Sequence, residues 1–446
     1  MAQLFDFGLV GLGVMGRNFL LNVADHHFSA IGLDTDAQKV ADLKDEGHSD
    51  DIEGTLDKVE FIKKLARPRK IMLLVPAGGP VDHVITDLLP LLDSGDLIID
   101  GGNSHFEDTN RRFTSLKSKD IHFMGSGVSG GSEGARMGPS IMPGGDSKAY
   151  EIIKPIFEAV AAKVNNEPCV DFMGKGSAGN YVKMIHNGIE YVEMQLIASI
   201  YKLLIESNNY TNQNIAQIFE DWNNNLNSYL IDISTKKMLE KIDDEYLLEK
   251  IDDIADDNGT GRWMLNYGVE LGCSLSMLSS ALNTRFISKL KSERNELNKS
   301  IKQNSVEYKV DINSLKNAYK FCRLVNYIQA FCLINSANKN YNWQISILKA
   351  LNVWSNGSII KSSLINDLYS NYFVENILND KKIIKDLNES KSDLINIITL
   401  SLKNDISIPC FNDALEYFNS ISNNSLSTNM IQAQRNFFGS HSIKIK

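Results

Sequence analysis

The stretch that decides the fold of this chain is Gly11-Leu12-Gly13-Val14-Met15-Gly16. It follows a short apolar segment, residues 4–10, and precedes a helical pattern over residues 17–26. In a strand–turn–helix context the first glycine permits the tight turn, the second lets a pyrophosphate approach the backbone, and the third lets the helix pack on the sheet. The start of that helix offers unpaired N–H groups to a phosphate. The sequence therefore predicts an α/β, Rossmann-type dinucleotide-binding domain at the N-terminal end.

A second apolar segment, residues 28–34, ends in Asp34, where the dinucleotide fingerprint has an acidic residue about 20 positions further on. A carboxylate here accepts a hydrogen bond from the ribose 2′-hydroxyl of NAD and repels the 2′-phosphate of NADP. Asp34, Thr35 and Asp36 include no arginine, and Lys39 is the nearest cation. These residues favour NAD. The alternative is that the two acids only cap the following helix, because Asp is a good N-cap residue.

The alternation of strands and turns continues to residue 145. Strands are predicted at residues 70–75, 96–100, 121–124 and 140–142, and a helix over residues 80–92. The turns expected after these strands contain glycine and span residues 76–79, 101–104, 125–131 and 143–145. The strand ends of an open α/β sheet meet at its ligand crevice. We therefore expect these turns to face a ligand.

After residue 178 proline becomes rare and helical patterns dominate, for example over residues 188–206, 214–226 and 276–299. The acidic run from Glu240 to Asp257 is predicted to be a solvated helix face. We therefore predict three parts. These are a dinucleotide-binding domain over residues 1–178, a large all-α domain over residues 179–430, and a short C-terminal tail over residues 431–446.

The helix predicted over residues 180–195 carries an unusual polar stripe. Lys183, His186, Asn187 and Glu190 fall at i, i+3, i+4 and i+7, which places them on one face. Apolar residues occupy the other sides. Such a stripe is either a solvated surface with a Lys/Glu pair or the polar wall of a site.

The composition limits the class of protein. The chain has 446 residues, 43% of them hydrophobic, and a net charge of −9, which argues against general binding to nucleic acid or anionic membranes. The N-terminal segment has no basic region and no cleavage site, and no apolar run is long enough for a membrane span. The five cysteines are scattered without metal-type spacing, so we expect reduced thiols, a cytoplasmic location and no metal.

Five motifs then stand in a distinctive order: GLGVMG at residues 11–16, DGGNS at 100–104, GSGVSGG at 125–131, KMIHNGIEY at 183–191 and MIQAQRNFFGSH at 430–441. With them, nearly the whole chain resembles the decarboxylating 6-phosphogluconate dehydrogenase family. The resemblance is strongest up to residue 200 and thins over about 295–425. It implies oxidative decarboxylation of 6-phosphogluconate to ribulose 5-phosphate, a step of the pentose phosphate pathway, in an obligate homodimer.

The resemblance also implies roles for individual residues. Lys183 is implied to be the general base for the 3-hydroxyl of the sugar acid, and Glu190 the acid that protonates C1 after CO₂ has left. Arg285 is implied to bind the phosphate, and Arg435 and His441 to reach into the partner subunit's site. The remaining implied substrate contacts are Asn103, Ser129, Gly130, Gly131, His186, Asn187, Tyr191 and Asn258.

The residues expected to contact the dinucleotide combine the fingerprint with the strand ends. They are Gly11, Leu12, Gly13, Val14, Met15, Gly16, Asp34, Thr35, Asp36, Val75, Pro76, Ala77 and Asn103. NADP is the cofactor that the resemblance implies. NAD is the cofactor that Asp34 favours, because Thr35 stands where the family has an arginine for the 2′-phosphate.

The sequence departs from the family at three further points. Asn258 replaces a phosphate-binding lysine, Pro76 replaces a lysine, and the chain ends soon after His441. A charge-assisted hydrogen bond contributes about 1.5–3 kcal/mol against about 1 kcal/mol for a neutral one, so we expect Asn258 to weaken the hold on a phosphate. Whether Arg262 compensates stays open. Two alternatives also stay open: a related β-hydroxyacid dehydrogenase acting on a non-phosphorylated acid, and a homologue without turnover.

Overall fold

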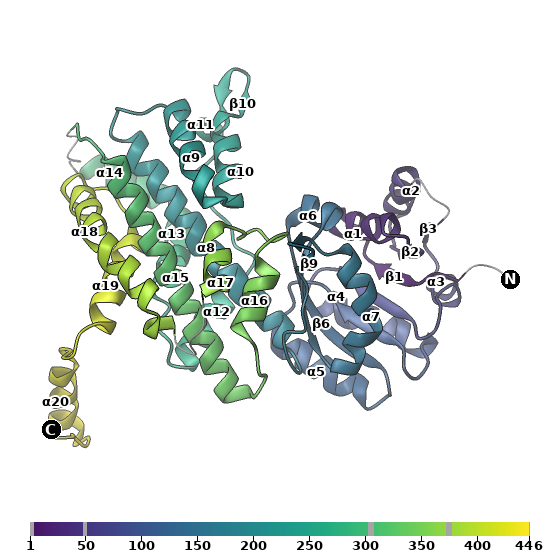
Figure 1. Ribbon diagram of the computed structural model, residues 1–446. Coiled ribbons are helices and arrows are strands. Elements are labelled where there is room, and N and C mark those ends of the chain that lie inside the picture. Colours follow the sequence, from purple (N-terminus) through teal and green to yellow (C-terminus); the bar gives the residue numbers. More distant parts are fainter. Residues whose placement is uncertain (1–3, 48–50, 302–306, 372–376, 446) are drawn as a thin grey trace.

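The computed structural model describes residues 4–47, 51–301, 307–371 and 377–445. A sheet flanked by helices forms one half of the molecule, and a body of helices forms the other (Figure 1). The sheet has seven strands in the order β3-β2-β1-β4-β5-β6-β7. Its strands are β1 (Phe7–Val10), β2 (Ala30–Leu33), β3 (Ile52–Thr55), β4 (Lys70–Leu73), β5 (Leu97–Asp100), β6 (His122–Ser129) and β7 (Ser140–Gly145). The first six run parallel in the 3-2-1-4-5-6 order of dinucleotide-binding folds, which confirms the predicted fold class.

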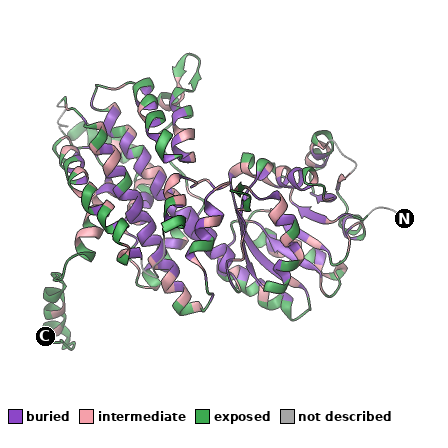
Figure 2. Ribbon diagram, viewed as in Figure 1, coloured by how far each residue is buried: buried purple, intermediate pink, exposed green. Residues whose placement is uncertain are grey.

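Helices cover both faces of the sheet, so most residues of its strands are buried (Figure 2). Two separate apolar clusters, one including Phe7, Phe19 and Phe157 and the other including Phe61 and Phe123, lie against the sheet. The helices of this half are α1 (Val14–Asp25), α2 (Ala37–Glu46), α3 (Lys58–Lys63), α4 (Gly79–Leu88), α5 (Phe106–Lys117), α6 (Gly131–Met137) and α7 (Ser147–Val160). A small hairpin of β8 (Lys163–Val164) and β9 (Glu167–Pro168) ends it.

The sheet differs from its sequence prediction in three respects. Strand β3 was not predicted, and β7 runs antiparallel to β6. The predicted glycine turns at residues 125–131 and 143–145 are wrong for most of their length, because β6 continues to Ser129 and β7 to Gly145. These glycines lie within strands because a helix packs directly on them. A Cβ on Gly127 would lie 2.3 Å from the Cβ of Lys183, and one on Gly144 would lie 2.2 Å from the backbone nitrogen of Gly179.

That helix, α8 (Ala178–Ile205), leads from the sheet into the centre of the helical body, where α8 and α15 are buried (Figure 2). The other helices are α9 (Asn212–Leu226), α10 (Tyr229–Leu239), α11 (Leu247–Lys250), α12 (Thr260–Glu270), α13 (Ser276–Ser288), α14 (Lys291–Ser300), α15 (Ile312–Tyr341), α16 (Ile347–Trp354), α17 (Ser363–Asn371), α18 (Lys381–Lys403), α19 (Pro409–Ile421) and α20 (Thr428–Gly439). No helix in the described ranges is both long and apolar enough to cross a bilayer.

Two helix predictions in this half were wrong. The pattern over residues 276–299 is two helices, α13 and α14, which are separated at Lys289 and Leu290. The acidic run forms a hairpin of β10 (Lys241–Ile242) and β11 (Glu245–Tyr246), followed by α11 and a loop. Asp243 and Asp244 adopt positive φ values of 51° and 67° at its turn, a conformation that Asp tolerates better than most residues. The run is nevertheless mostly exposed, as expected.

A buried ion pair fixes α8 against α15. The Nε of Arg323 lies 2.8 Å from Oε1 of Glu193, and both side chains are only 2% exposed. The Tyr319 hydroxyl donates to the same carboxylate at 3.0 Å, and the guanidinium also donates to Ser362 at 2.7 Å. Breaking a buried pair by removing one partner leaves an uncompensated charge, which costs about 3–5 kcal/mol.

We therefore expect Glu193→Met to lower the free energy of unfolding by about 3–5 kcal/mol, measured by urea denaturation. Glu206→Met, at the C-cap of the same helix, is the matched control. Its partner is Lys202 at 2.8 Å, but both side chains are about half exposed, and exposed pairs contribute about 0–1 kcal/mol. Equal losses in the two variants would contradict this account of α8.

Candidate active site

The polar stripe of α8 is buried where the helix leaves the sheet. Lys183 is 6% exposed, His186 is fully buried and Asn187 is 3% exposed. Glu190 is partly buried. The alternative of a solvated surface is therefore wrong, and four polar side chains share one enclosed position.

These side chains lie within reach of one another and of a strand end. The Nζ of Lys183 is 3.5 Å from Nδ1 of His186, and the same Nδ1 is 3.8 Å from a carboxylate oxygen of Glu190. On the other side of the ring, Nε2 lies 2.9 Å from the hydroxyl of Ser129, the last residue of β6. The close packing of α8 on the glycines of β6 makes this approach possible.

Burial changes the proton affinities of all three titratable groups. It lowers the pKa of Lys183 to about 8, against a smaller opposing effect of Glu190. It lowers the pKa of His186 well below its ordinary value, and nearby Lys183 acts in the same direction. It raises the pKa of Glu190, although Lys183 and Arg285 oppose the rise. Near neutral pH His186 is thus neutral, about a tenth of Lys183 is a neutral amine, and Glu190 holds a proton more readily than an ordinary carboxyl group.

Tyr191, Arg285 and the segment before α12 form the distal end of the site. The guanidinium of Arg285 lies 3.6 Å from the centre of the Tyr191 ring. The Tyr191 hydroxyl donates to the side-chain oxygen of Asn258 at 2.9 Å. Arg262 pairs with Asp257 at 3.0 Å, so part of its charge is already neutralised. Arg285 is therefore the cation that this end offers to a ligand.

The other predicted substrate contacts fall into two groups. Gly130 and Gly131 directly follow Ser129 and have φ values of 126° and 63°, and Asn103 is exposed in the segment after β5. Arg435 and His441 lie on and just after α20, which projects from the helical body, and both are exposed (Figure 1). The fold therefore does not bring these last two residues to the site of their own chain.

The glycine-rich turn fits a dinucleotide. Gly11 has a φ of 101°, and a Cβ on Gly16 would lie 1.9 Å from the carbonyl oxygen of Gly11, so neither position accepts a side chain. Space is open beside Gly13, where a phosphate can approach the start of α1. The remaining residues expected here lie in the same turn, at the start of α1 or shortly after β4, and they are Leu12, Val14, Met15, Val75, Pro76 and Ala77.

The acidic segment after β2 has structural roles beyond those expected. The Asp34 carboxylate accepts from the backbone N–H of Leu12 at 2.7 Å and of Asp36 at 3.0 Å, and Lys39 lies 3.6 Å from it. It thus ties β2 to the glycine-rich turn. Asp36 caps α2 by accepting from Gln38 at 2.9 Å, as the capping alternative proposed. Thr35 is exposed.

Two residues that join the site were not predicted. The Thr260 hydroxyl oxygen accepts from the amide of Asn187 at 3.1 Å, and the backbone N–H of Ile359 donates to Ser129 at 3.2 Å. Both are brought in from segments distant in the sequence. Thr260 lies two residues after Asn258, in the stretch Gly259-Thr260-Gly261, and no motif in the sequence marks Ile359.

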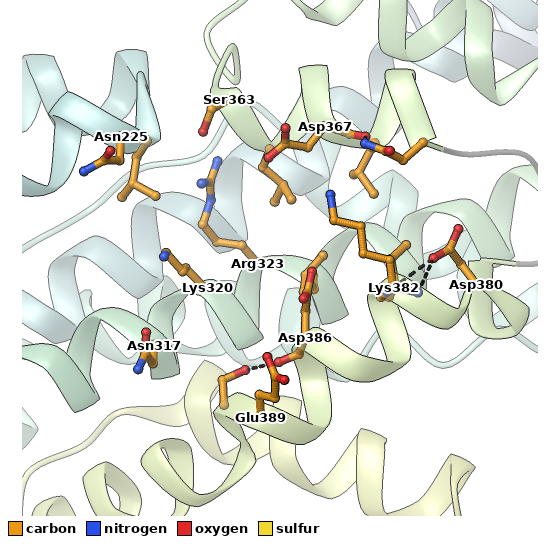
Figure 3. Close-up of a pocket in the computed structure, with 17 residues that line it drawn as sticks. Asn225, Asn317, Lys320, Arg323, Ser363, Asp367, Asp380, Lys382, Asp386 and Glu389 are labelled. Atoms are coloured by element: carbon orange, nitrogen blue, oxygen red, sulfur yellow. Dashed lines mark hydrogen bonds between the residues drawn. The ribbon is translucent and has the colours of Figure 1, made fainter.

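The helical body also contains a separate cavity of about 460 Å³ between α9, α15, α17 and α18. Figure 3 shows the charged side chains along its wall, including Lys320, Arg323, Asp367 and Lys382. The predicted site residues are not among those that line it. It is therefore distinct from the polar stripe of α8.

Two family models together cover nearly the whole chain. The NAD binding domain of 6-phosphogluconate dehydrogenase matches residues 6–174, and the 6-phosphogluconate dehydrogenase C-terminal domain matches residues 179–446. The chain belongs to the 6-phosphogluconate dehydrogenase family. It is 40% identical to "6-phosphogluconate dehydrogenase, decarboxylating 1" of Saccharomyces cerevisiae, over 99% of this chain and 93% of that protein.

A bacterial relative and a solved structure agree with this assignment. The decarboxylating 6-phosphogluconate dehydrogenase of Lactococcus lactis strain IL1403 is 38% identical, over 98% of this chain and 95% of its own. The Plasmodium falciparum 6-phosphogluconate dehydrogenase has a TM-score of 0.94 at 35% identity, covering 99% of this chain and 98% of that one. That enzyme was solved in its apo form and in complexes with NADP⁺ and with 6-phosphogluconate. This 6-phosphogluconate dehydrogenase family member is accordingly an oxidoreductase.

Proposed function

We propose that the chain converts 6-phospho-D-gluconate to D-ribulose 5-phosphate and CO₂ while reducing NADP or NAD. The observation that carries this proposal is the buried set of Lys183, His186 and Glu190 beside the end of β6. A base and an acid with opposite pKa shifts suit a reaction that first removes a proton and later adds one.

In the first step the neutral amine of Lys183 takes the proton of the C3 hydroxyl as the C3–H bond breaks. A bound nicotinamide supplies the chemistry of accepting that hydride. The product is a 3-keto acid beside a protonated Lys183. The glycine-rich turn and the residues after β4 would hold the dinucleotide, with Asn103 between it and the substrate.

In the second step the bond between C1 and C2 breaks and CO₂ leaves. Its electron pair forms an enolate whose negative charge collects on the C3 oxygen, where the Lys183 ammonium stabilises it and returns its proton. Glu190, two turns along the same face, then donates a proton to the carbon that lost CO₂, which is C1 of ribulose 5-phosphate. His186, Asn187 and Ser129 with Gly130 and Gly131 orient the substrate, and Arg285 and Tyr191 hold its phosphate.

The proposed enzyme is a homodimer. Each chain of it has a dinucleotide-binding domain over residues 1–178, an all-α domain over residues 179–430 and a tail over residues 431–446. Arg435 and His441 are exposed on a projecting tail, so they complete the site of a second copy in this proposal. The five cysteines are unpaired, as reduced thiols of a cytoplasmic enzyme would be.

One assay tests the proposed reaction. Purified protein is mixed with 6-phosphogluconate and either NAD or NADP, and both reduced nicotinamide and released CO₂ are followed. We expect equimolar amounts of the two products. Absence of turnover with both cofactors would refute the proposal. Turnover of gluconate in preference to its phosphate would favour a dehydrogenase for a non-phosphorylated acid, which the uncharged Asn258 and the pairing of Arg262 with Asp257 make the second candidate.

The cofactor preference depends on the exposed segment after β2. We expect NAD to serve at least as well as NADP, because Asp34 stands at the acidic position of the fingerprint, which favours a ribose 2′-hydroxyl, and Thr35 offers no charge to a 2′-phosphate. Thr35→Arg should then raise the ratio of kcat/KM for NADP over NAD about 10- to 100-fold, since one charge-assisted hydrogen bond contributes about 1.5–3 kcal/mol. Thr35→Gln, long but neutral, is the control. A strong NADP preference of the unaltered protein would contradict this expectation.

A further inference from the structure

A continuous series of hydrogen bonds crosses the site from one end to the other. It begins at the backbone N–H of Ile359 and passes through Ser129, His186 and Asn187. It continues through Thr260 to Asn258, which also accepts from Tyr191. Each hydroxyl has one proton to donate, and a side-chain amide donates only from its nitrogen and accepts only at its oxygen, so the direction of each bond can be followed along the series.

At the distal end the side-chain oxygen of Asn258 is an acceptor only. It accepts from the Tyr191 hydroxyl at 2.9 Å, from the Thr260 hydroxyl at 2.7 Å and from the Thr260 backbone N–H at 3.2 Å. The hydroxyl proton of Thr260 is therefore directed to Asn258. The Thr260 oxygen is left to accept, and the side-chain amide of Asn187 donates to it at 3.1 Å.

This orientation of Asn187 decides which nitrogen of His186 carries the proton. With its NH₂ group on Thr260, Asn187 presents its oxygen to Nδ1 of His186 at 3.1 Å, so Nδ1 carries hydrogen. The other end agrees. Ser129 accepts from Ile359 at 3.2 Å and gives its own proton to Nε2 at 2.9 Å. The Asn187 end specifies the neutral Nδ1–H tautomer, and the Ser129 hydroxyl, whose proton is not used by Ile359, can donate to the bare Nε2.

We infer that Thr260 and Asn258 are positioning residues that hold His186 in this tautomer and thereby keep Lys183 available as a base. The Nδ1 atom lies 3.5 Å from the Nζ of Lys183. Because Nδ1 carries the hydrogen that it donates to Asn187, it has no lone pair left to accept from a Lys183 ammonium, so the charged form gains no hydrogen bond there. The link to catalysis rests on the proposed function, but the tautomer itself does not.

The other groups around Lys183 do not fix its protonation state by themselves, so the tautomer of His186 can influence it. Glu190 on the same helix favours the ammonium, Arg285 of α13 acts on Glu190, and the residue of β6 that completes the set, Ser129, is neutral. Burial and the hydrogen on Nδ1 of His186 both favour the neutral amine of Lys183 over the ammonium. If His186 lost that hydrogen, the pKa of Lys183 should rise, and the pH dependence of kcat/KM measures this change.

Thr260→Val removes the acceptor for Asn187 while keeping the shape of the side chain. The Asn187 amide is then free to turn over and donate to Nδ1, which allows the Lys183 ammonium to donate there too. We expect the acidic limb of the kcat/KM profile to move up by about one pH unit, the size of one hydrogen bond gained by the charged form. Thr260→Ser keeps the oxygen and should leave the profile in place.

The tautomer can be read without any turnover. The protein has eight histidines, and ¹⁵N-histidine labelling with a His186→Gln spectrum identifies the two ring nitrogens of His186. We expect a protonated Nδ1 and a bare Nε2 at pH 7 in the unaltered protein and in Thr260→Ser, and loss of that pattern in Thr260→Val. Asn258→Ala, at an exposed position, should shift the protonation pattern of the His186 ring in the same direction as Thr260→Val but by less. Asn258→Asp should leave that pattern unchanged, because its side chain keeps an oxygen that accepts from Thr260.

An Nε2–H tautomer or an imidazolium in the unaltered protein would overturn the inference. So would an unchanged tautomer and pH profile in Thr260→Val. If the protein failed to oxidise 6-phosphogluconate, the proposed function would fall, and the spectra would still decide the role of Thr260 and Asn258.

Discussion

Lys183→Ala lowers kcat about 10²–10⁴-fold and leaves dinucleotide binding unchanged, if Lys183 is the general base. The residue lies on the buried face of α8, beside His186 and Glu190, while the glycine-rich turn follows β1, which β4 and β5 separate from β6 in the sheet. Removing the amine takes away both the proton acceptor of the oxidation and the cation that stabilises the enolate. Single-turnover kinetics measure the chemical step, and fluorescence titration measures cofactor affinity.

Lys202→Ala is the matched control, because Lys202 lies on the same helix but is half exposed in a pair with Glu206. We expect it to keep full activity. Comparable losses of activity in the two variants would show that the rate depends on an intact α8 and not on the amine of Lys183. Full activity of Lys183→Ala would refute the role of the base.

The same lysine predicts the pH dependence. Its pKa is lowered to about 8, so about half of the amine is neutral at pH 8, against about 0.3% for an ordinary lysine at 10.5. Because the neutral amine is the active form, kcat/KM should fall about tenfold per pH unit well below pH 8 and level off above it. A profile that is flat from pH 6 to 9 would contradict this assignment.

The sequence predicted the parts of the site that depend on local periodicity. The glycine-rich turn follows from residues 11–16, and the one-sided polar stripe of α8 follows from the spacing of Lys183, His186, Asn187 and Glu190. Both predictions use contacts between residues a few positions apart, which a single segment determines.

What the sequence could not predict depends on residues that meet only in the fold. Gly125 and Gly127 were assigned to a turn, because glycine is typical of turns, but they lie in β6 so that α8 can approach. Thr260 contacts Asn187 across 73 positions, and Ile359 contacts Ser129 across 230. The burial that shifts the pKa of Lys183 is likewise a tertiary effect.

Gly127→Ala tests the close packing of α8 on β6. After Lys183→Ala, we expect this variant to lower the reaction rate most. The new Cβ would lie 2.3 Å from the Cβ of Lys183, which is fixed to the helix backbone and cannot rotate away. Strand β6 is held by β7, where Gly127 pairs with Met142, so α8 must move or the strand must yield. A misplacement of about 1 Å at a catalytic group costs about 10²-fold in rate.

We therefore expect Gly127→Ala to lower kcat/KM about 10²-fold, measured at saturating cofactor, with cofactor affinity unchanged. Gly134→Ala is the control, because its Cβ would meet its nearest neighbour, the carbonyl oxygen of Gly357, at 3.4 Å, and α6 accepts alanine readily. If Gly127→Ala kept full activity, the position of Lys183 would not depend on the close packing of helix and strand. The expected low rate would mean that Gly127 contributes to the reaction by allowing α8 to place Lys183 correctly. Within residues 125–131, contact with the substrate would then be the role of Gly130 and Gly131.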